Sequence, residues 1–279
     1  FLGEYSWSVV IASLILTVCV AAVLIGGVKR IASVSQIVVP FMAILYFAFA
    51  VILIICNITE IPAAIKVIVT AAFTPKAVTG GAVGSMFVAM QKGVARGIFS
   101  NEAGLGSAPI AAAAAQTKEP VRQGLVSMTG TFIDTIVICT LTGLSIVLTG
   151  AWQVEGLEGV EVTTYAFQQG LPFPPAVSSF VLMLCLVFFA FTTILGWDYY
   201  SERCLEYLSG GNLKHVKVYR WIYIFAVFIG PYMTVSAVWT IADIFNGLMA
   251  LPNMIALFAL NGVVVYETKK FFEAGKHKK

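Results

Sequence analysis

The sequence predicts an all-helical protein that crosses a membrane several times. Hydrophobic residues make up 59% of its 279 residues and charged residues only 11%, whereas a soluble domain carries roughly 25% charged residues. The charged residues also lie mainly between long apolar runs. This arrangement is typical of an α-helical polytopic membrane protein.

The first spans follow from two apolar runs at about 7–27 and 36–56, each close to the ~20 residues that a spanning helix needs. We assign residues 1–56 to these two helices and 57–81 to an external connecting segment with prolines and a short apolar piece. The chain opens on Phe1 with no charged leader before the first run. We therefore expect a fragment boundary at this end and no signal peptide.

The third span, 82–117, is interrupted. Its first half runs from Ala82 to Phe99 and its second from Ala108 to Gln116, and between them residues 100–107 read SNEAGLGS. A polar, glycine-bearing stretch in the middle of an apolar span predicts a helix broken at 100–107.

Four further spans are expected at about 123–149, 175–208 (apolar to Trp197), 218–235 and 243–266. A short amphipathic helix is expected near 163–169, and a basic tail occupies 267–279. Basic residues concentrate on one side of this arrangement, and the acidic loop 155–161 lies on the other. The positive-inside rule then predicts a multi-pass protein of the cell membrane with a cytoplasmic C-terminus. Lys66 and Lys76 are the only basic residues that this arrangement places on the external side.

The interruption is the main functional signal. Irregular backbone is tolerated at membrane depth only where protein or a wet cavity surrounds it. The end of the first half-helix offers carbonyl groups to a cation, and the start of the second offers N–H groups to a carboxylate. Gly104 and Gly106 allow unusual backbone angles and the close approach of a ligand. The alternative is an ordinary interfacial loop.

Asp134 lies about 11 residues into its span, or roughly 16 Å along the helix axis, close to the membrane midplane. A carboxylate at that depth is costly and is usually functional or paired. One hypothesis makes it a Na⁺ ligand together with Asn101 and Thr135. Another has it accept hydrogen bonds from the backbone of the broken helix. The third makes it the ion-pair partner of Arg96. Glu102 is an alternative partner for the same arginine, and the role of Asp243 is equally open.

Several function classes have no support. The net charge is only +3, which disfavours a nucleic-acid partner. The two histidines lie in basic stretches, and no catalytic triad, phosphate-binding loop or transition-metal spacing is present. We therefore expect no enzymatic activity and no cofactor other than a coupling ion.

A family resemblance rests on residues 93–109, which read GVARGIFSNEAGLGSAP. The likeness continues through 120–124 (PVRQG), 193–197 (TILGW) and 246–253 (NGLMALPN). These motifs resemble the signature of the alanine/glycine:cation symporter family. A run of more than a dozen consecutive motif residues is highly specific, and the resemblance covers essentially the whole chain.

The resemblance implies a leucine-transporter-type fold of two inverted five-helix repeats. On that scheme the chain holds helices four to ten, 82–266 is the second repeat, and helices one to three are missing. The family's substrate contacts would fall on Phe99, Ser100 and Asn101, together with Thr193 and Trp197. Thr192 and Thr193 are candidate Na⁺ ligands, although a threonine that bonds its own helix and a tryptophan that anchors at the interface are the alternatives.

The predicted function is the Na⁺-coupled import of a small neutral amino acid, L-alanine or glycine, by alternating access. One rival is a seven-helix receptor or sensor, which has no use for a polar break at 100–107. The other is a transport-inactive fragment, because part of the expected site would lie on the missing helices. We expect no transport from the 279-residue chain alone.

Overall fold

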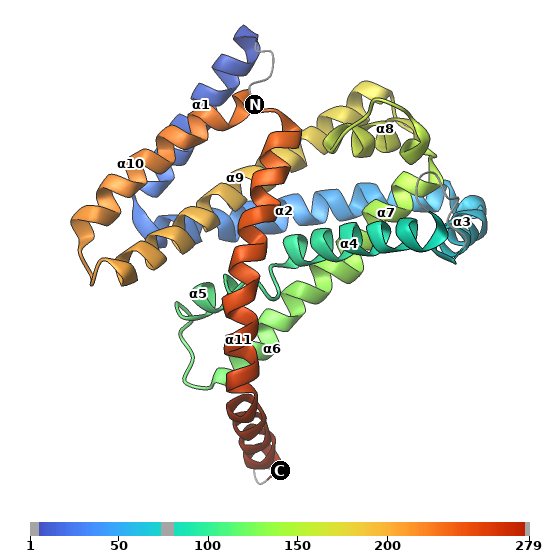
Figure 1. Cartoon of the computed structure of the whole chain (residues 1–279). Helices are drawn as coiled ribbons and strands as arrows, with labels where there is room; N and C mark the ends of the chain where they lie inside the picture. Colours follow the sequence, from blue (N-terminus) through green and yellow to red (C-terminus); the bar gives the residue numbers. More distant parts are fainter. Residues whose placement is uncertain (1–5, 74–80, 277–279) are drawn as a thin grey trace. The chain divides into compact units, whose positions relative to one another are not determined.

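The computed structural model describes residues 6–73 and 81–276, and its regular elements are helices (Figure 1). The α-helices are α1 (Trp7–Leu24), α2 (Gly27–Cys56), α3 (Ile61–Phe73), α4 (Gly81–Asn101), α5 (Ala108–Ala112), α6 (Pro120–Phe132), α7 (Cys139–Leu148), α8 (Val160–Gly170), α9 (Pro175–Leu208), α10 (Leu213–Ile229) and α11 (Val235–Lys276). Short 3₁₀ turns lie at Ile58–Glu60, Ala151–Gln153 and Gly230–Tyr232, and a π-helical segment, Ile133–Ile138, joins α6 to α7.

The chain forms two compact units. The first unit contains Phe1–Val69 and Leu141–Val238, and the second contains Thr70–Thr140 and Trp239–Lys279. Pro75, Lys76 and the last lysines of the basic tail lie outside the described residues, so the structure does not test the expectations that involve them.

Five of the described helical segments are long and apolar enough to cross a membrane: Trp7–Leu24, Gly27–Cys56, Pro120–Leu148, Pro175–Leu208 and Val235–Ala274. Their large apolar side chains are widely exposed: in α11, Ile255 is 71% exposed and Phe258 is 79% exposed. Such continuous apolar surface is unfavourable in water and suits contact with lipid. The prediction of an all-helical polytopic membrane protein is therefore confirmed.

Two of the seven predicted spans fall short of this length and composition. α10 is only 17 residues long and carries Lys214, Lys217 and Arg220. α4 contains Lys92 and Arg96 among many small residues. Charged side chains lower the hydropathy of both segments, so an orientation based on seven crossings stays a prediction.

Two helix boundaries also differ from the sequence-based expectation. α2 begins at Gly27, so the basic pair Lys29–Arg30 belongs to its first turn and not to a loop. The second half of the broken span is the five-residue α5, which ends at Ala112 and not at Gln116. The poly-alanine run after Ala112 continues as turns, because alanine alone supplies no packing face to hold a short helix.

The first unit is held together by two apolar clusters. In one, Val20 and Leu24 of α1 pack with Leu195 of α9 and Ile224 of α10. In the other, Leu53 of α2 packs with residues of α8 and α9 that include Phe167 and Leu182. α9 therefore supplies the element around which α1, α2, α8 and α10 pack (Figure 1).

Gly170 ends α8 where this second cluster is tightest. A Cβ atom at this position would lie 2.7 Å from Leu53 Cγ and 2.9 Å from Thr149 Cγ2. Asn57 fixes the same junction, because its Nδ2 donates to the carbonyl oxygens of Leu53 (2.8 Å) and Gly170 (2.9 Å). Only glycine fits here without displacing the α2 core residue.

We expect Gly170→Ala to destabilise the protein by about 1–3 kcal/mol, because the added methyl group overpacks the contact with Leu53. The matched control is Gly143→Ala in α7, where nothing lies within 4 Å of the new Cβ atom. Thermal unfolding in detergent measures both variants. Equal melting temperatures for the two variants would contradict the packing assigned to Gly170.

Candidate functional site: the interruption between α4 and α5

The interruption spans residues 102–107, between the end of α4 at Asn101 and the start of α5 at Ala108. Three of its residues have left-handed backbone angles: Glu102 (φ 54°), Gly104 (φ 100°) and Gly106 (φ 84°). Glycine adopts such angles freely, whereas a glutamate does so only when its surroundings hold it there. Glu102 is the one described residue other than glycine with a positive φ.

Side chains at both ends of the interruption hold its backbone. The amide of Ala103 donates to Asn101 Oδ1 (2.9 Å), a turn that the short amide side chain favours. The Ser107 hydroxyl donates to Glu102 Oε2 (2.6 Å), and the amide of Leu105 donates to the Glu102 carbonyl (3.2 Å). Leu105 and Ser107 are almost fully buried. These contacts account for the strained angle at Glu102.

The π-helical segment faces this end of α4. It widens the helix by one residue per turn over Ile133–Ile138, and such segments recur at functional sites. Ser100 Oγ donates to Asp134 Oδ2 (2.6 Å), and Asn101 Nδ2 donates to Thr135 Oγ1 (2.8 Å). Two consecutive residues at the end of α4 thus meet two consecutive residues of the π-helical segment.

α11 contacts another side of α4. Arg96 Nη2 lies 2.8 Å from Asp243 Oδ2, and its guanidinium carbon lies 4.0 Å from the centre of the Trp239 ring. Phe99 packs edge-on against the same tryptophan, with ring centroids 5.2 Å apart. Further along α11, Asn253 approaches the interruption, since a Cβ atom on Gly106 would lie 3.3 Å from its Oδ1.

The expected partners of Arg96 were therefore wrong. The arginine pairs with Asp243 and stacks on Trp239, while Asp134 accepts a hydrogen bond from Ser100 and Glu102 accepts one from Ser107. An arginine one turn before a break can reach carboxylates on several elements. The choice among them depends on tertiary packing that local sequence does not encode.

The arrangement gathers the donor types that a small zwitterion and a hard cation need. Asp134, Thr135 and Ser100 supply carboxylate and hydroxyl oxygens at the end of α4, where the last carbonyl groups of a helix have no partner within the helix. Left-handed backbone angles recur at Glu102, Gly104 and Gly106, and turns of this kind can direct backbone N–H groups toward an anion. In the described residues, no group of three His, Cys, Asp or Glu side chains could hold a metal ion.

The other predicted contacts, Thr192, Thr193 and Trp197, belong to the first unit, on α9. The Thr192 hydroxyl donates to the carbonyl oxygens of Phe188 (3.0 Å) and Phe189 (3.1 Å) of its own helix. Thr193 is exposed, and Trp197, one turn later, packs edge-on against Tyr200 at 5.7 Å. The second unit thus brings together four of the predicted contacts, Ser100, Asn101, Asp134 and Thr135. Thr192, Thr193 and Trp197 belong to the first unit, which is described separately.

Sequence reasoning did not identify Trp239, Asn253 or the π-helical segment as parts of the site. A sequence signal existed only for α11, where polar and aromatic residues follow one another at intervals of four, three and seven: Trp239, Asp243, Asn246 and Asn253. That spacing places them on one helix face. The π-helical segment leaves no comparable signal, because it depends on which backbone bonds form.

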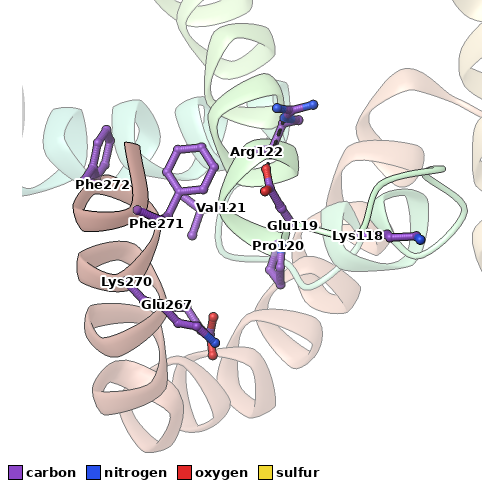
Figure 2. Close-up of a pocket in the computed structure, with 10 residues that line it drawn as sticks. Lys118, Glu119, Pro120, Val121, Arg122, Glu267, Lys270, Phe271 and Phe272 are labelled. Atoms are coloured by element: carbon purple, nitrogen blue, oxygen red, sulfur yellow. Dashed lines mark ion pairs between the residues drawn. The ribbon is translucent and has the colours of Figure 1, made fainter. Parts of the chain in front are cut away.

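A cavity of about 390 Å³ lies elsewhere in the second unit, between the start of α6 and the last turns of α11 (Figure 2). Its walls include Lys118, Arg122, Glu267 and Lys270, and Arg122 forms an ion pair with Glu119 (3.4 Å). None of the predicted substrate or Na⁺ contacts lines this cavity. Its charged rim lies at helix ends, away from the interruption along the chain.

Comparison with known proteins identifies similar sequences over the whole chain. The model of the sodium:alanine symporter family matches residues 1–279. An uncharacterised transporter of Haemophilus influenzae is 55% identical over 266 residues, which cover 95% of this chain and 58% of that protein. A sodium/alanine symporter of Methanococcus maripaludis is 45% identical, covering 96% of this chain and 58% of that protein.

A probable sodium/glutamine symporter of Bacillus subtilis is 38% identical over 258 residues, or 92% of this chain and 52% of that protein. The chain therefore spans a little more than half the length of the curated relatives described here.

We expect Asn101→Ala to destabilise the interruption by about 1–2 kcal/mol, because it removes the hydrogen bonds to Ala103 and Thr135, each worth about 1 kcal/mol. Hydrogen–deuterium exchange should become faster at 103–107. Asn212→Ala is the matched control, since Asn212 caps α10 through the amide of Lys214 (3.0 Å) and its loss should affect only that helix end. Unchanged exchange at 103–107 in the Asn101 variant would contradict this account.

Proposed function

Because the chain belongs to the sodium:alanine symporter family, a family of membrane transporters and not of enzymes, we propose that it takes part in Na⁺-coupled import of a small neutral amino acid. The similarity to the sodium/alanine symporter of Methanococcus maripaludis supports alanine as the substrate. The similarity to the probable sodium/glutamine symporter of Bacillus subtilis makes glutamine, a larger neutral amino acid, the second candidate. The receptor interpretation is not favoured by this family membership.

The observation that carries the proposal is the interruption itself. At the end of α4, in the second unit, Ser100 is hydrogen-bonded to Asp134 and Asn101 is hydrogen-bonded to Thr135. Polar and ionisable groups inside a membrane protein are costly to place there, and they are usually paired, functional or both. A site that exchanges these protein contacts for contacts with a ligand explains why they are concentrated there.

The Na⁺ ion would bind where α4 ends. Asp134 supplies the negative charge, and Thr135 and Asn101 supply hydroxyl and amide oxygens, as the sequence-based hypothesis has it. Carbonyl groups at the C-terminal end of a half-helix add further oxygens of the kind that transporters use for Na⁺. The Ser100–Asp134 hydrogen bond would open on cation binding, which links the cation to the position of the α4 end.

The amino acid would bind beside it. Its carboxylate would bind N–H groups of 102–107 other than those of Ala103 and Leu105, which already have partners in the protein. The five-residue α5 is too short to contribute much of a helix dipole. Phe99 is the proposed apolar wall in the second unit, and Gly104 allows close approach of the ligand. Thr193 and Trp197 of α9 stay proposed contacts on the family resemblance alone. Thr192 keeps lone pairs for a cation even while it donates to its own helix.

The proposal includes a fold of two inverted five-helix repeats, in which the spans of this chain would correspond to helices four to ten. Helices one to three would complete the site in that arrangement. Transport would then follow from alternating access, with Na⁺ favouring the state that binds the amino acid. The binding of Na⁺ can shift this equilibrium only by its difference in affinity for the two states.

We expect the protein expressed from its complete gene to accumulate labelled alanine in proteoliposomes only when a Na⁺ gradient points inward. In Asp134→Asn the Na⁺ concentration for half-maximal uptake should rise about tenfold, equivalent to a loss of roughly 1.4 kcal/mol of cation binding. Glu119→Gln is the matched control, because Glu119 is exposed and pairs only with Arg122. Unlabelled glycine and glutamine added as competitors define the substrate range.

Two outcomes would oppose the proposal. Uptake that ignores the Na⁺ gradient removes sodium coupling. An Asp134→Asn variant with the Na⁺ dependence of the unmodified protein removes this carboxylate from the cation site.

A further inference from the structure

Asp198 is a buried carboxyl group that the proposed transport site does not use. It lies on α9, directly after Trp197, and is only 1% exposed. Leu195, one turn earlier, belongs to the apolar cluster that joins α9 to α1 and α10. The Asp198 Oδ1 atom is buried and has no hydrogen-bond partner.

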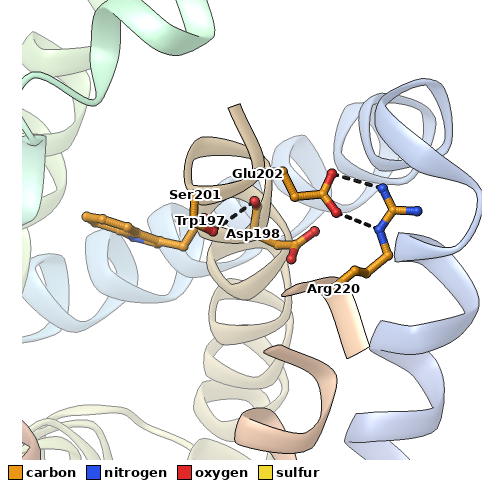
Figure 3. Close-up of polar contacts among 5 residues, drawn as sticks. All are labelled: Trp197, Asp198, Ser201, Glu202 and Arg220. Atoms are coloured by element: carbon orange, nitrogen blue, oxygen red, sulfur yellow. Dashed lines mark hydrogen bonds and ion pairs between the residues drawn. The ribbon is translucent and has the colours of Figure 1, made fainter. Parts of the chain in front are cut away.

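A second buried carboxylate lies one turn further along α9. Glu202 is 4% exposed, and Arg220 of α10 binds both of its oxygens, with Nε 2.5 Å from Oε1 and Nη2 2.9 Å from Oε2 (Figure 3). In this bidentate ion pair, the single positive charge of Arg220 balances the single negative charge of Glu202. The charge of Arg220 is therefore already balanced before Asp198 is considered.

The other polar side chains near Asp198 donate their hydrogen bonds to backbone carbonyl oxygens. The Tyr223 hydroxyl of α10 donates to the carbonyl oxygen of Ile194 (2.8 Å). Ser201 donates to the backbone carbonyl oxygens of Trp197 (2.8 Å) and Asp198 (3.0 Å), and not to the Asp198 carboxyl group.

The charged and titratable groups that interact with Asp198 are Glu202 on its own helix and Arg220 and Tyr223 on α10. On α1, which also packs against α9, the described residues include one titratable group, Cys19, and it is exposed. Lys29 and Arg30 at the start of α2 are exposed as well. Within the described residues, no cation besides Arg220 is placed to balance an ionised Asp198.

We propose that Asp198 is a proton-binding site, with a proton on its carboxyl group in the structure described here. If both Asp198 and Glu202 were ionised, two buried negative charges would face the single positive charge of Arg220, which is partly exposed. An uncompensated charge in such a place is strongly disfavoured, and proton uptake removes it. The step is simple: the carboxylate and one proton from solvent become a neutral carboxylic acid.

Because Asp198 is next to Trp197 in the chain, its protonation state changes the charge beside that tryptophan. Release of the proton would place a negative charge directly beside Trp197, so that α9 would respond to pH at a residue proposed as a substrate contact. This consequence rests on the proposed function, whereas the proton-binding site itself does not.

Infrared spectroscopy of the protein expressed from its complete gene, purified and returned to lipid, tests the proposal without requiring transport. Near neutral pH, the spectrum should contain the C=O stretch of a protonated carboxylic acid, shifted to lower frequency in D₂O. The Asp198→Asn variant should lose this band. Glu206→Gln, on the same helix and paired with Arg203, is the matched control and should keep it.

A second variant covers the case in which Asp198→Asn does not fold. Asp198→Glu keeps an acid group and should move the band to a different frequency. The proposal is overturned if the unmodified protein has no such band, if Asp198→Asn keeps it, or if it stays unmoved in Asp198→Glu.

Discussion

The structure of the second unit depends on one constraint: the backbone groups left unpaired where α4 ends must find other hydrogen-bond partners. Each unsatisfied group costs several kcal/mol in hydrocarbon, so a break at membrane depth needs local support. Here Asn101 satisfies the amide of Ala103, and Ser107 and Glu102 bond each other across the break. The left-handed angle at Glu102 is then a consequence of contacts on both sides of it, and not a defect.

The same constraint explains the neighbouring elements. The π-helical segment turns Asp134 and Thr135 toward Ser100 and Asn101, and α11 covers another side of α4 through Trp239 and Asp243. α4 is thereby held along its length by an ion pair and aromatic packing, while its end is held by hydrogen bonds alone. Hydrogen bonds exchange with ligand or water at little net cost, whereas buried packing does not. A ligand can therefore act at the α4 end without disturbing the rest of the helix.

Much of this was predictable from local sequence. The apolar runs identify the membrane helices, and the polar, glycine-bearing stretch at 100–107 predicts an interruption because those residues cannot lie in lipid as exposed backbone. The partner of Arg96 was not predictable, since Asp243 lies 147 residues away and the choice depends on packing. The shortness of α5 and the burial of the Asp198 carboxyl group have the same origin: each depends on which neighbours a segment finds.

The central claim is that the interruption between α4 and α5 is where the amino acid and its cation bind. A structure of the protein from its complete gene, determined with bound alanine and Na⁺, tests it most directly. The account predicts density for the amino acid carboxylate against the backbone N–H groups of 102–107, and for the cation beside Asp134 and the last carbonyl groups of α4. Ligand density remote from these residues, with the Ser100–Asp134 and Asn101–Thr135 contacts unchanged, would contradict it.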